Sequence, residues 1–259
     1  MSDSKVQPGE VTVGRCYKNS PIVEAVCEFR FIPDPNWDMA IPGLFYESVK
    51  AEFPARKGRN TVSLGLSLGN EETTHQVTTG KLVQFIREDG QELLQVGENL
   101  LSVNRLKPYG VWEEFRDLID RSFGQFCEIA KPGGLARIGL RYINVIEIDA
   151  DPVKLEHFFD FYPKLGDRLP QEFTTFIAGI ETPYEGGRDL RRLTMTPSGS
   201  PSEESVTSIL LDIDYGLQKP SEVPMEKALE WVEVAHRHVE STFEACITDD
   251  LRVLFGLEG

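Results

Sequence analysis

The 259-residue sequence has no long hydrophobic run and a deficit of basic side chains. No apolar stretch approaches the roughly 20 residues that cross a bilayer, and the first 15 residues lack the apolar segment of a secretory signal. With 27 Lys and Arg against 42 Asp and Glu, the formal net charge is −15, which repels polyanions. These absences argue against nucleic acid or a membrane as partner and favour an acidic, soluble, cytoplasmic protein.

Motifs for metal, cofactor or nucleophile chemistry are also missing. The four cysteines have no CxxC pair and mostly fall on apolar faces, which indicates reduced, buried thiols: Cys16, Cys27, Cys127 and Cys246. His236 and His238 lie two apart on a helix and so face different ways; Glu233 and His236 have ExxH spacing, but a dimetal bundle needs a second such motif. No glycine loop has the GxGxxG, GxxxxGK or GxSxG pattern. We therefore expect no metal and no cofactor.

What the sequence does contain is an alternation of strand and helix patterns. The first part predicts a strand over 21–32, a helix beginning near Pro42 and Gly43, three strand-forming runs between 61 and 106, and a helix over 112–130 that the KPGG sequence ends. Asp89-Gly90 marks a hairpin between two of the runs. The second part predicts a strand over 135–148, a short helix opened by Asp151 and Pro152, three strands within 172–217 and a helix over 226–247.

Each part thus follows the order strand, helix, three strands, long helix, which suggests a tandem duplication. Adding 120 to five apolar positions of the first long helix reaches five apolar positions of the last: Trp112 and Val232, Phe115 and Ala235, Ile119 and Val239, Phe123 and Phe243, Phe126 and Cys246. Amphipathic helices that converged on the same pattern are the alternative. We predict an α+β fold with one antiparallel sheet, long helices on one face and pseudo-twofold symmetry, divided into a loose leader (1–19) and two repeats (20–132 and 133–259) that share a core.

Four segments together are similar to a known family. PIVEAVCEFRF, VNRLKPYGVWEEF, RIGLRYIN and FEACITDDLRVLFG resemble a sporadically distributed family of uncharacterised prokaryotic proteins of about this length, over nearly the whole chain from Pro21 onward. The resemblance implies a patchily inherited cytoplasmic accessory protein of mobile or defence-related neighbourhoods. It assigns no residue role.

The first candidate site follows from charges on strands. Residues 23, 25, 27, 29 and 31 share an apolar side that should face the core, as should Ile138, Leu140 and Tyr142. The opposite face would carry five charged side chains: Glu24, Glu28, Arg30, Arg137 and Arg141. Near a pseudo-dyad they could bind an anionic group, or they could form cross-strand ion pairs on a solvated face.

Two further features could contact a partner. Arg188, Arg191 and Arg192 follow the Gly186-Gly187 turn and could bind phosphate, RNA or an acidic protein, or could be exposed arginines of a hairpin. The last helix carries an acidic stripe that is typical of a solvated face but could meet a basic protein: Glu226, Glu230, Glu233, Glu240 and Glu244.

We therefore expect a non-enzymatic binding or interaction module that recognises a partner protein or a small anionic ligand. The alternative is a hydrolytic or nucleic-acid-processing enzyme that uses the Glu/Arg cluster on the open sheet face. A homodimer through a sheet edge stays open, because edge exposure has no signature in this sequence.

Overall fold

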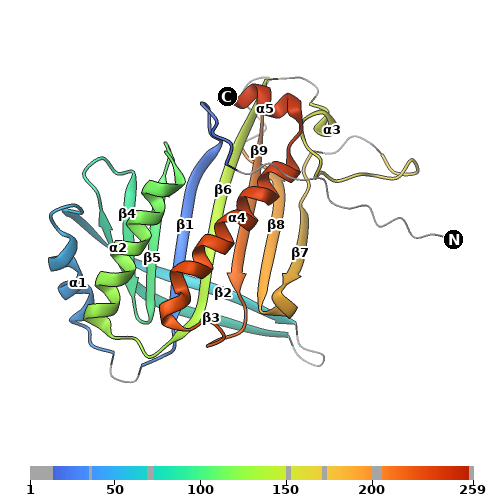
Figure 1. Cartoon of the computed structure of the whole chain (residues 1–259). Coiled ribbons are helices and arrows are strands. Elements are labelled where there is room, and N and C mark those ends of the chain that lie inside the picture. Colours follow the sequence, from blue (N-terminus) through green and yellow to red (C-terminus); the bar gives the residue numbers. More distant parts are fainter. Residues whose placement is uncertain are drawn as a thin grey trace.

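The computed structural model describes residues 14–34, 37–68, 73–149, 153–170, 174–199 and 206–256, with the side chains of 60–80 and 206 left out. It is an α+β fold in which nine strands form one antiparallel sheet in the order β2-β3-β4-β5-β1-β6-β9-β8-β7 (Figure 1). The strands are β1 (Ile22–Phe31), β2 (Ala55–Leu68), β3 (Thr73–Ile86), β4 (Glu92–Gly97), β5 (Leu100–Leu106), β6 (Leu135–Asp149), β7 (Ala178–Tyr184), β8 (Asp189–Pro197) and β9 (Val206–Leu217).

Three helices lie on one face of this sheet, and within the described ranges the other face carries no helix; we call it the helix-free face (Figure 1). They are α1 (Ile41–Val49), α2 (Trp112–Ala130) and α4 (Ala228–Cys246). Two short helices, α3 (Leu155–Phe158) and α5 (Asp249–Phe255), meet at one end of the sheet. In the described residues, single 3-10 turns occupy Glu185–Gly187 and Met225–Lys227.

The ends of α2 follow from local sequence. Glu113 and Glu114 lie in its first turn, where acidic side chains interact favourably with the helix dipole. Lys131 then adopts a left-handed conformation (φ 48°) and is followed by Pro132, which cannot continue a helix. The predicted helix over 112–130 is therefore confirmed at both ends.

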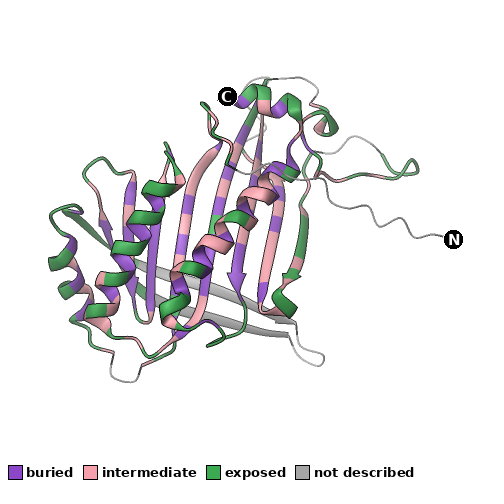
Figure 2. Cartoon of the chain, in the orientation of Figure 1, coloured by how far each residue is buried: buried purple, intermediate pink, exposed green. Residues whose placement is uncertain are grey.

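The core lies between the helices and the sheet (Figure 2). Alternate residues of β1 point into it, with Ala25, Cys27 and Phe29 fully buried, and from β6 Ile138, Leu140 and Tyr142 do the same. Because β1 and β6 pair with each other at the centre of the sheet, one hydrophobic cluster includes residues of both parts of the chain. The expected direction of these side chains is confirmed.

Two predictions about elements need correction. The third strand-forming run of the first part is a hairpin, because the chain turns at Glu98 and Asn99 between β4 and β5; Asn99 has φ 55°, a left-handed conformation that Asn tolerates. The helix α5 has no counterpart among the predicted elements. The predicted cap formed by Asp151 and Pro152 lies outside the described residues.

Two sequence expectations concern membranes and thiols. Among the helices in the described ranges, none has both the length and the apolar composition that crossing a bilayer requires. Cys27 and Cys246 are buried and Cys127 is half-buried, whereas Cys16 is exposed. Burial raises the pKa of the Cys127 thiol to about 11 and that of Cys246 to about 12, so both stay protonated at neutral pH.

Candidate functional site

The predicted charged cluster does assemble on the helix-free face, as a chain of ion pairs. Arg30 lies opposite Arg137 in the pairing of β1 with β6. The Glu28 carboxylate accepts hydrogen bonds from Arg30 at 2.7 Å and from Arg137 at 3.3 Å. Arg137 also forms an ion pair with Asp214 of β9, with an N–O distance of 3.1 Å.

Two glycines give Arg137 its position. A Cβ atom at Gly139 would lie 2.8 Å from the guanidinium of Arg137, and one at Gly216 would lie 2.9 Å from it. The guanidinium therefore lies flat across the two neighbouring strands, where a side chain at either position would displace it.

The other two members of the predicted cluster have separate partners. Arg141 donates two hydrogen bonds to Asp212, at 2.7 and 2.6 Å, and the hydrogen bond to Asp212 raises its pKa. Glu24 accepts from the amide of Asn104 at 2.7 Å. Each arginine of the cluster thus has a carboxylate already, which leaves little reason for an anion to bind there.

The three arginines after the Gly186-Gly187 turn point to different places. Arg188 pairs with the fully buried Asp189 at 2.6 Å. Arg191 extends toward α4, donates to Thr242 at 3.0 Å and lies over the ring of Tyr184. Arg192 lies on the helix-free face beside Asp214. They do not form one cationic patch.

The structure also divides the acidic stripe of α4. Glu230 is exposed, but Glu240 is half-buried and Glu244 is buried, so the expectation of a solvated face is wrong for its last two turns. In the described part of the chain, no three His, Cys, Asp or Glu side chains are close enough together to hold a metal ion.

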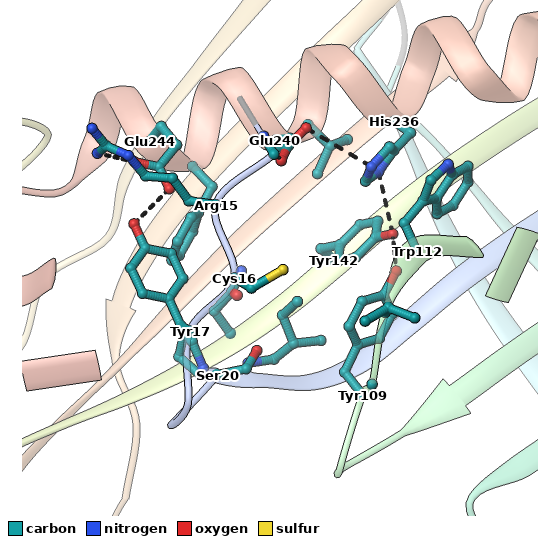
Figure 3. Close-up of a pocket in the computed structure, with 18 of the residues that line it drawn as sticks. Arg15, Cys16, Tyr17, Ser20, Tyr109, Trp112, Tyr142, His236, Glu240 and Glu244 are labelled. Carbon is teal, nitrogen blue, oxygen red and sulfur yellow. Dashed lines mark hydrogen bonds and ion pairs between the residues drawn. The ribbon is translucent and has the colours of Figure 1, made fainter. Parts of the chain in front are cut away.

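The inward-facing end of this stripe lines a cavity of about 560 Å³ on the helix side of the sheet (Figure 3). The cavity lies between the start of α2 and the second half of α4, β6 and β9 contribute to its floor, and residues 14–22 cross it. Its lining is mostly apolar, with several aromatic rings and a few polar groups. The side chains with polar groups in the lining include Tyr109, Glu113, Tyr142, His236, Glu240 and Glu244.

A hydrogen-bonded chain of three rings forms one wall of the cavity (Figure 3). The hydroxyl groups of Tyr109 and Tyr142 are 2.5 Å apart, and Tyr142 Oη lies 3.5 Å from Nδ1 of His236. The His236 ring stacks on the indole of Trp112, with centroids 3.9 Å apart and planes inclined by 10°. This stack joins α4 to α2 across the cavity.

Burial keeps all three ring groups uncharged. It raises the pKa of both tyrosines well above the usual value, so their hydroxyl groups stay protonated. Burial, with a smaller effect of Arg237, lowers the pKa of His236 to about 4, so the imidazole is neutral at physiological pH. The wall offers polar atoms without charge.

Charge is concentrated on the opposite wall, where residues 14–20 meet α4. We call these residues the strap. Glu244 is only 3% exposed and accepts hydrogen bonds from Tyr17 at 2.6 Å, Arg15 at 3.1 Å and Arg252 at 3.0 Å. One turn earlier, Glu240 accepts the backbone N–H of Gly14 at 2.5 Å. Part of the segment expected to be a loose leader is thereby attached to α4.

Sequence reasoning missed this cavity, although it noted the acidic stripe to which Glu240 and Glu244 belong. Tyr109 lies in the segment VNRLKPYGVWEEF, which carries only the family resemblance, and Trp112 was predicted as an apolar position of the helix over 112–130 and not as part of a site. Asp212 and Asp214 were overlooked on the other face, even though they alternate with buried residues in LLDIDYG. That alternation was a usable signal, whereas nothing local marks the cavity.

Comparisons with known proteins add no identification. No family model matches the chain, and neither a curated protein nor a solved structure matches it.

Proposed function

We propose that the protein is a non-enzymatic binding module whose small-molecule ligand occupies the cavity between α2 and α4. The observation that carries this proposal is the cavity itself. Its volume of about 560 Å³ lies within the range of roughly 300 to 1,000 Å³ that is typical of ligand sites. A mostly apolar lining with a few polar groups in fixed positions is also typical of such sites.

Binding is favoured over catalysis because the uncharged polar groups of the cavity keep their protonation states near neutral pH. Tyr109 and Tyr142 hold protons that burial makes hard to remove. His236 is neutral, and its environment disfavours accepting a proton above about pH 4. The alternative, a hydrolytic enzyme on the helix-free face, would need a carboxylate free to act, and there Glu28 contacts two guanidinium groups.

We also propose that the chain is a tandem duplication with pseudo-twofold symmetry. Outward from the central β1/β6 pair, the strands run β5, β4, β3, β2 on one side and β9, β8, β7 on the other, so each side runs against chain order away from the centre and the first part has one strand more. The equivalent positions of α2 and α4 all lie on the sheet-facing sides of these helices. The ligand would then lie between two related helices, a common place for sites in duplicated folds.

The resemblance to prokaryotic accessory proteins is consistent with a binding role and adds no chemistry to it. We propose that ligand binding is the activity through which the protein serves such a system. The small anionic ligand that the sequence suggested is not part of this proposal, because the arginines that would bind it are paired with carboxylates.

The test uses Cys16, whose sulfur points into the cavity from the strap (Figure 3). The variant Cys16→Trp fills the cavity from an exposed position, and Cys16→Ser is the matched control that leaves it open. Each protein is incubated with a small-molecule extract of the native host and analysed by native mass spectrometry. We expect a bound mass in the wild type and in Cys16→Ser, and its loss in Cys16→Trp. An equal bound mass in all three proteins, or none in any, would refute the proposal.

A further inference from the structure

The lining of the cavity carries more negative than positive side chains. Three carboxylates line it, those of Glu113, Glu240 and Glu244, against a single cationic lining side chain, Arg15. Arg15 is already paired with Glu244, which also contacts Arg252. The cationic group of the cavity therefore neutralises an internal carboxylate and is not free for a ligand.

Among the described residues this arrangement leaves two lining carboxylates without a cationic side chain, Glu113 and Glu240; Glu113 is exposed to solvent, whereas Glu240 is half-buried. Its contacts are the backbone N–H of Gly14 at 2.5 Å and Nε2 of His236 at 3.9 Å. In the described ranges, no Lys or Arg side chain lies within ion-pair distance of Glu240. His236 does not serve as its counter-ion at neutral pH, because the pKa of the imidazole is lowered to about 4.

The surroundings of Glu240 make this missing counter-ion costly. Desolvation is the main reason why its pKa is raised, and the negative charges of Glu244 and Glu113 add to it, while the Gly14 N–H acts in the opposite direction. A positive charge beside Glu240 would offset the repulsion from Glu244 and Glu113 and would stabilise the carboxylate that burial has deprived of water. A second negative charge would add to that repulsion.

The walls suit an apolar or aromatic body next to that positive charge. Trp112, Tyr142 and Phe243 line the same cavity, from three different elements. Aromatic faces attract organic cations and also bury flat apolar groups well. Their combination with the half-buried carboxylate of Glu240, which has no Lys or Arg partner in the described ranges, is an arrangement that recognises amines and alkylated ammonium groups.

Building on the proposed ligand-binding function, we infer that the ligand is a small organic cation with a flat apolar body, whose positive charge lies at Glu240 and whose body packs between the aromatic walls. Glu240 is the residue that gives the site its charge preference. The shape of the cavity, rather than Glu240, determines which body fits.

The experiment uses three probes that share an indole ring and differ in charge: tryptamine is a cation, tryptophol is neutral and indole-3-acetate is an anion. Their dissociation constants are measured by calorimetry at neutral pH for the wild type and Glu240→Gln. Gln keeps the size of the side chain and still accepts the Gly14 N–H. The control Glu230→Gln removes an exposed carboxylate from the same helix, where it pairs with Lys227.

We expect tryptamine to bind about tenfold more tightly than tryptophol, with indole-3-acetate weakest. Glu240→Gln should remove the preference for tryptamine over tryptophol and leave the affinity for tryptophol unchanged. Glu230→Gln should behave as the wild type.

Three results would overturn the inference: an anion that binds as tightly as the cation, a cation preference that survives in Glu240→Gln, or no binding of tryptamine up to millimolar concentration. None of these removes the ligand site itself, because the Cys16→Trp experiment tests that site with whatever molecule the extract supplies. A bound mass that Cys16→Trp abolishes, together with no preference for tryptamine, would keep the proposed function and reject the cation.

Discussion

His236 links the stability of the cavity to pH. Its folded-state pKa of about 4 lies below the usual value of 6.5, so the native protein binds the proton less readily than the unfolded chain does. Above about pH 6.5 both states are neutral and the contribution to stability is complete. As the pH falls from there toward 4, the unfolded chain gains a proton that the native state does not, and stability is lost.

We predict that His236→Phe reduces this pH dependence. Phe preserves the stacking on Trp112 and has no proton to bind. Between about pH 7.5 and pH 5, the free energy of unfolding of the wild type should fall by about 2 kcal/mol more than that of the variant. Urea unfolding at both pH values measures it. The pKa of His238 is also lowered by burial, but it titrates in both proteins and cancels from the difference.

The exposed His157 provides the matched control. His157→Gln should keep the pH dependence of the wild type, because it leaves His236 and its stacking on Trp112 in place. If His236→Phe lost stability in acid as steeply as the wild type, the buried, neutral state of His236 would be the wrong explanation.

At the scale of residues, the sequence predicts which strand face is buried and misjudges which charges are exposed. The period of two in β1 identifies Ala25, Cys27 and Phe29 as core residues, because burial on a sheet face depends only on alternation. Glu240 and Glu244 flank the apolar stripe of α4, and such flanking positions are normally hydrated. They are covered here by the strap, which comes from the opposite end of the chain and leaves no local signal.

At the scale of elements, the strap depends on a single buried carboxylate. Glu244 accepts hydrogen bonds from Tyr17 and Arg15 of the strap and from Arg252 of α5. Burial, and after it Glu244, raises the pKa of the Tyr17 hydroxyl to about 12. Behind it, the backbone N–H groups of Lys18 and Asn19 donate to the carbonyl oxygens of Gly256 and Phe255. Strap, α4 and α5 are therefore held together at one point.

We predict that Glu244→Gln lowers the free energy of unfolding by about 2 kcal/mol, because the partly buried side chains of Arg15 and Arg252 lose hydrogen bonds to a charged acceptor. The amide hydrogens of Lys18 and Asn19 should exchange faster, as the strap loses its attachment. Chemical denaturation and hydrogen exchange measure the two effects.

The control is Glu230→Gln on the same helix, where the carboxylate is 69% exposed and pairs with Lys227. Its effect should stay below about 0.5 kcal/mol. Unchanged exchange at Lys18 and Asn19 in Glu244→Gln would mean that the backbone hydrogen bonds hold the strap without the carboxylate.

The elements themselves were mostly predictable because their signals are local. Pro132 and the glycines after it end α2, and Asp89-Gly90 joins β3 to β4 as expected. The turn at Glu98 and Asn99 was missed because the apolar residues on both sides of it read as one continuous strand. Gly97 and Asn99, both common in turns, were the available signal.

At the scale of the whole molecule, the position of the cavity depends on how the two parts of the chain associate. β1 pairs with β6, and α2 meets α4 through Trp112, which donates to Glu233 at 3.3 Å and stacks on His236. Neither contact can be derived from one part alone. The predicted shared core places the two parts together, but the cavity is lined by residues of both parts and so has no signal in either one.

This association predicts that the parts do not fold separately. A chain divided between Pro132 and Gly133 yields 1–132, with β1 exposed as an edge, and 133–259, with β6 exposed as an edge, each lacking the other's share of the core. Expressed alone, each fragment should aggregate or show no cooperative thermal transition by circular dichroism. Expressed together, they should elute as a one-to-one complex that melts cooperatively, because strand pairing and apolar burial need no covalent link. A monomeric fragment with its own sharp transition would show that its core is complete, and the cavity would then lie between two independent domains.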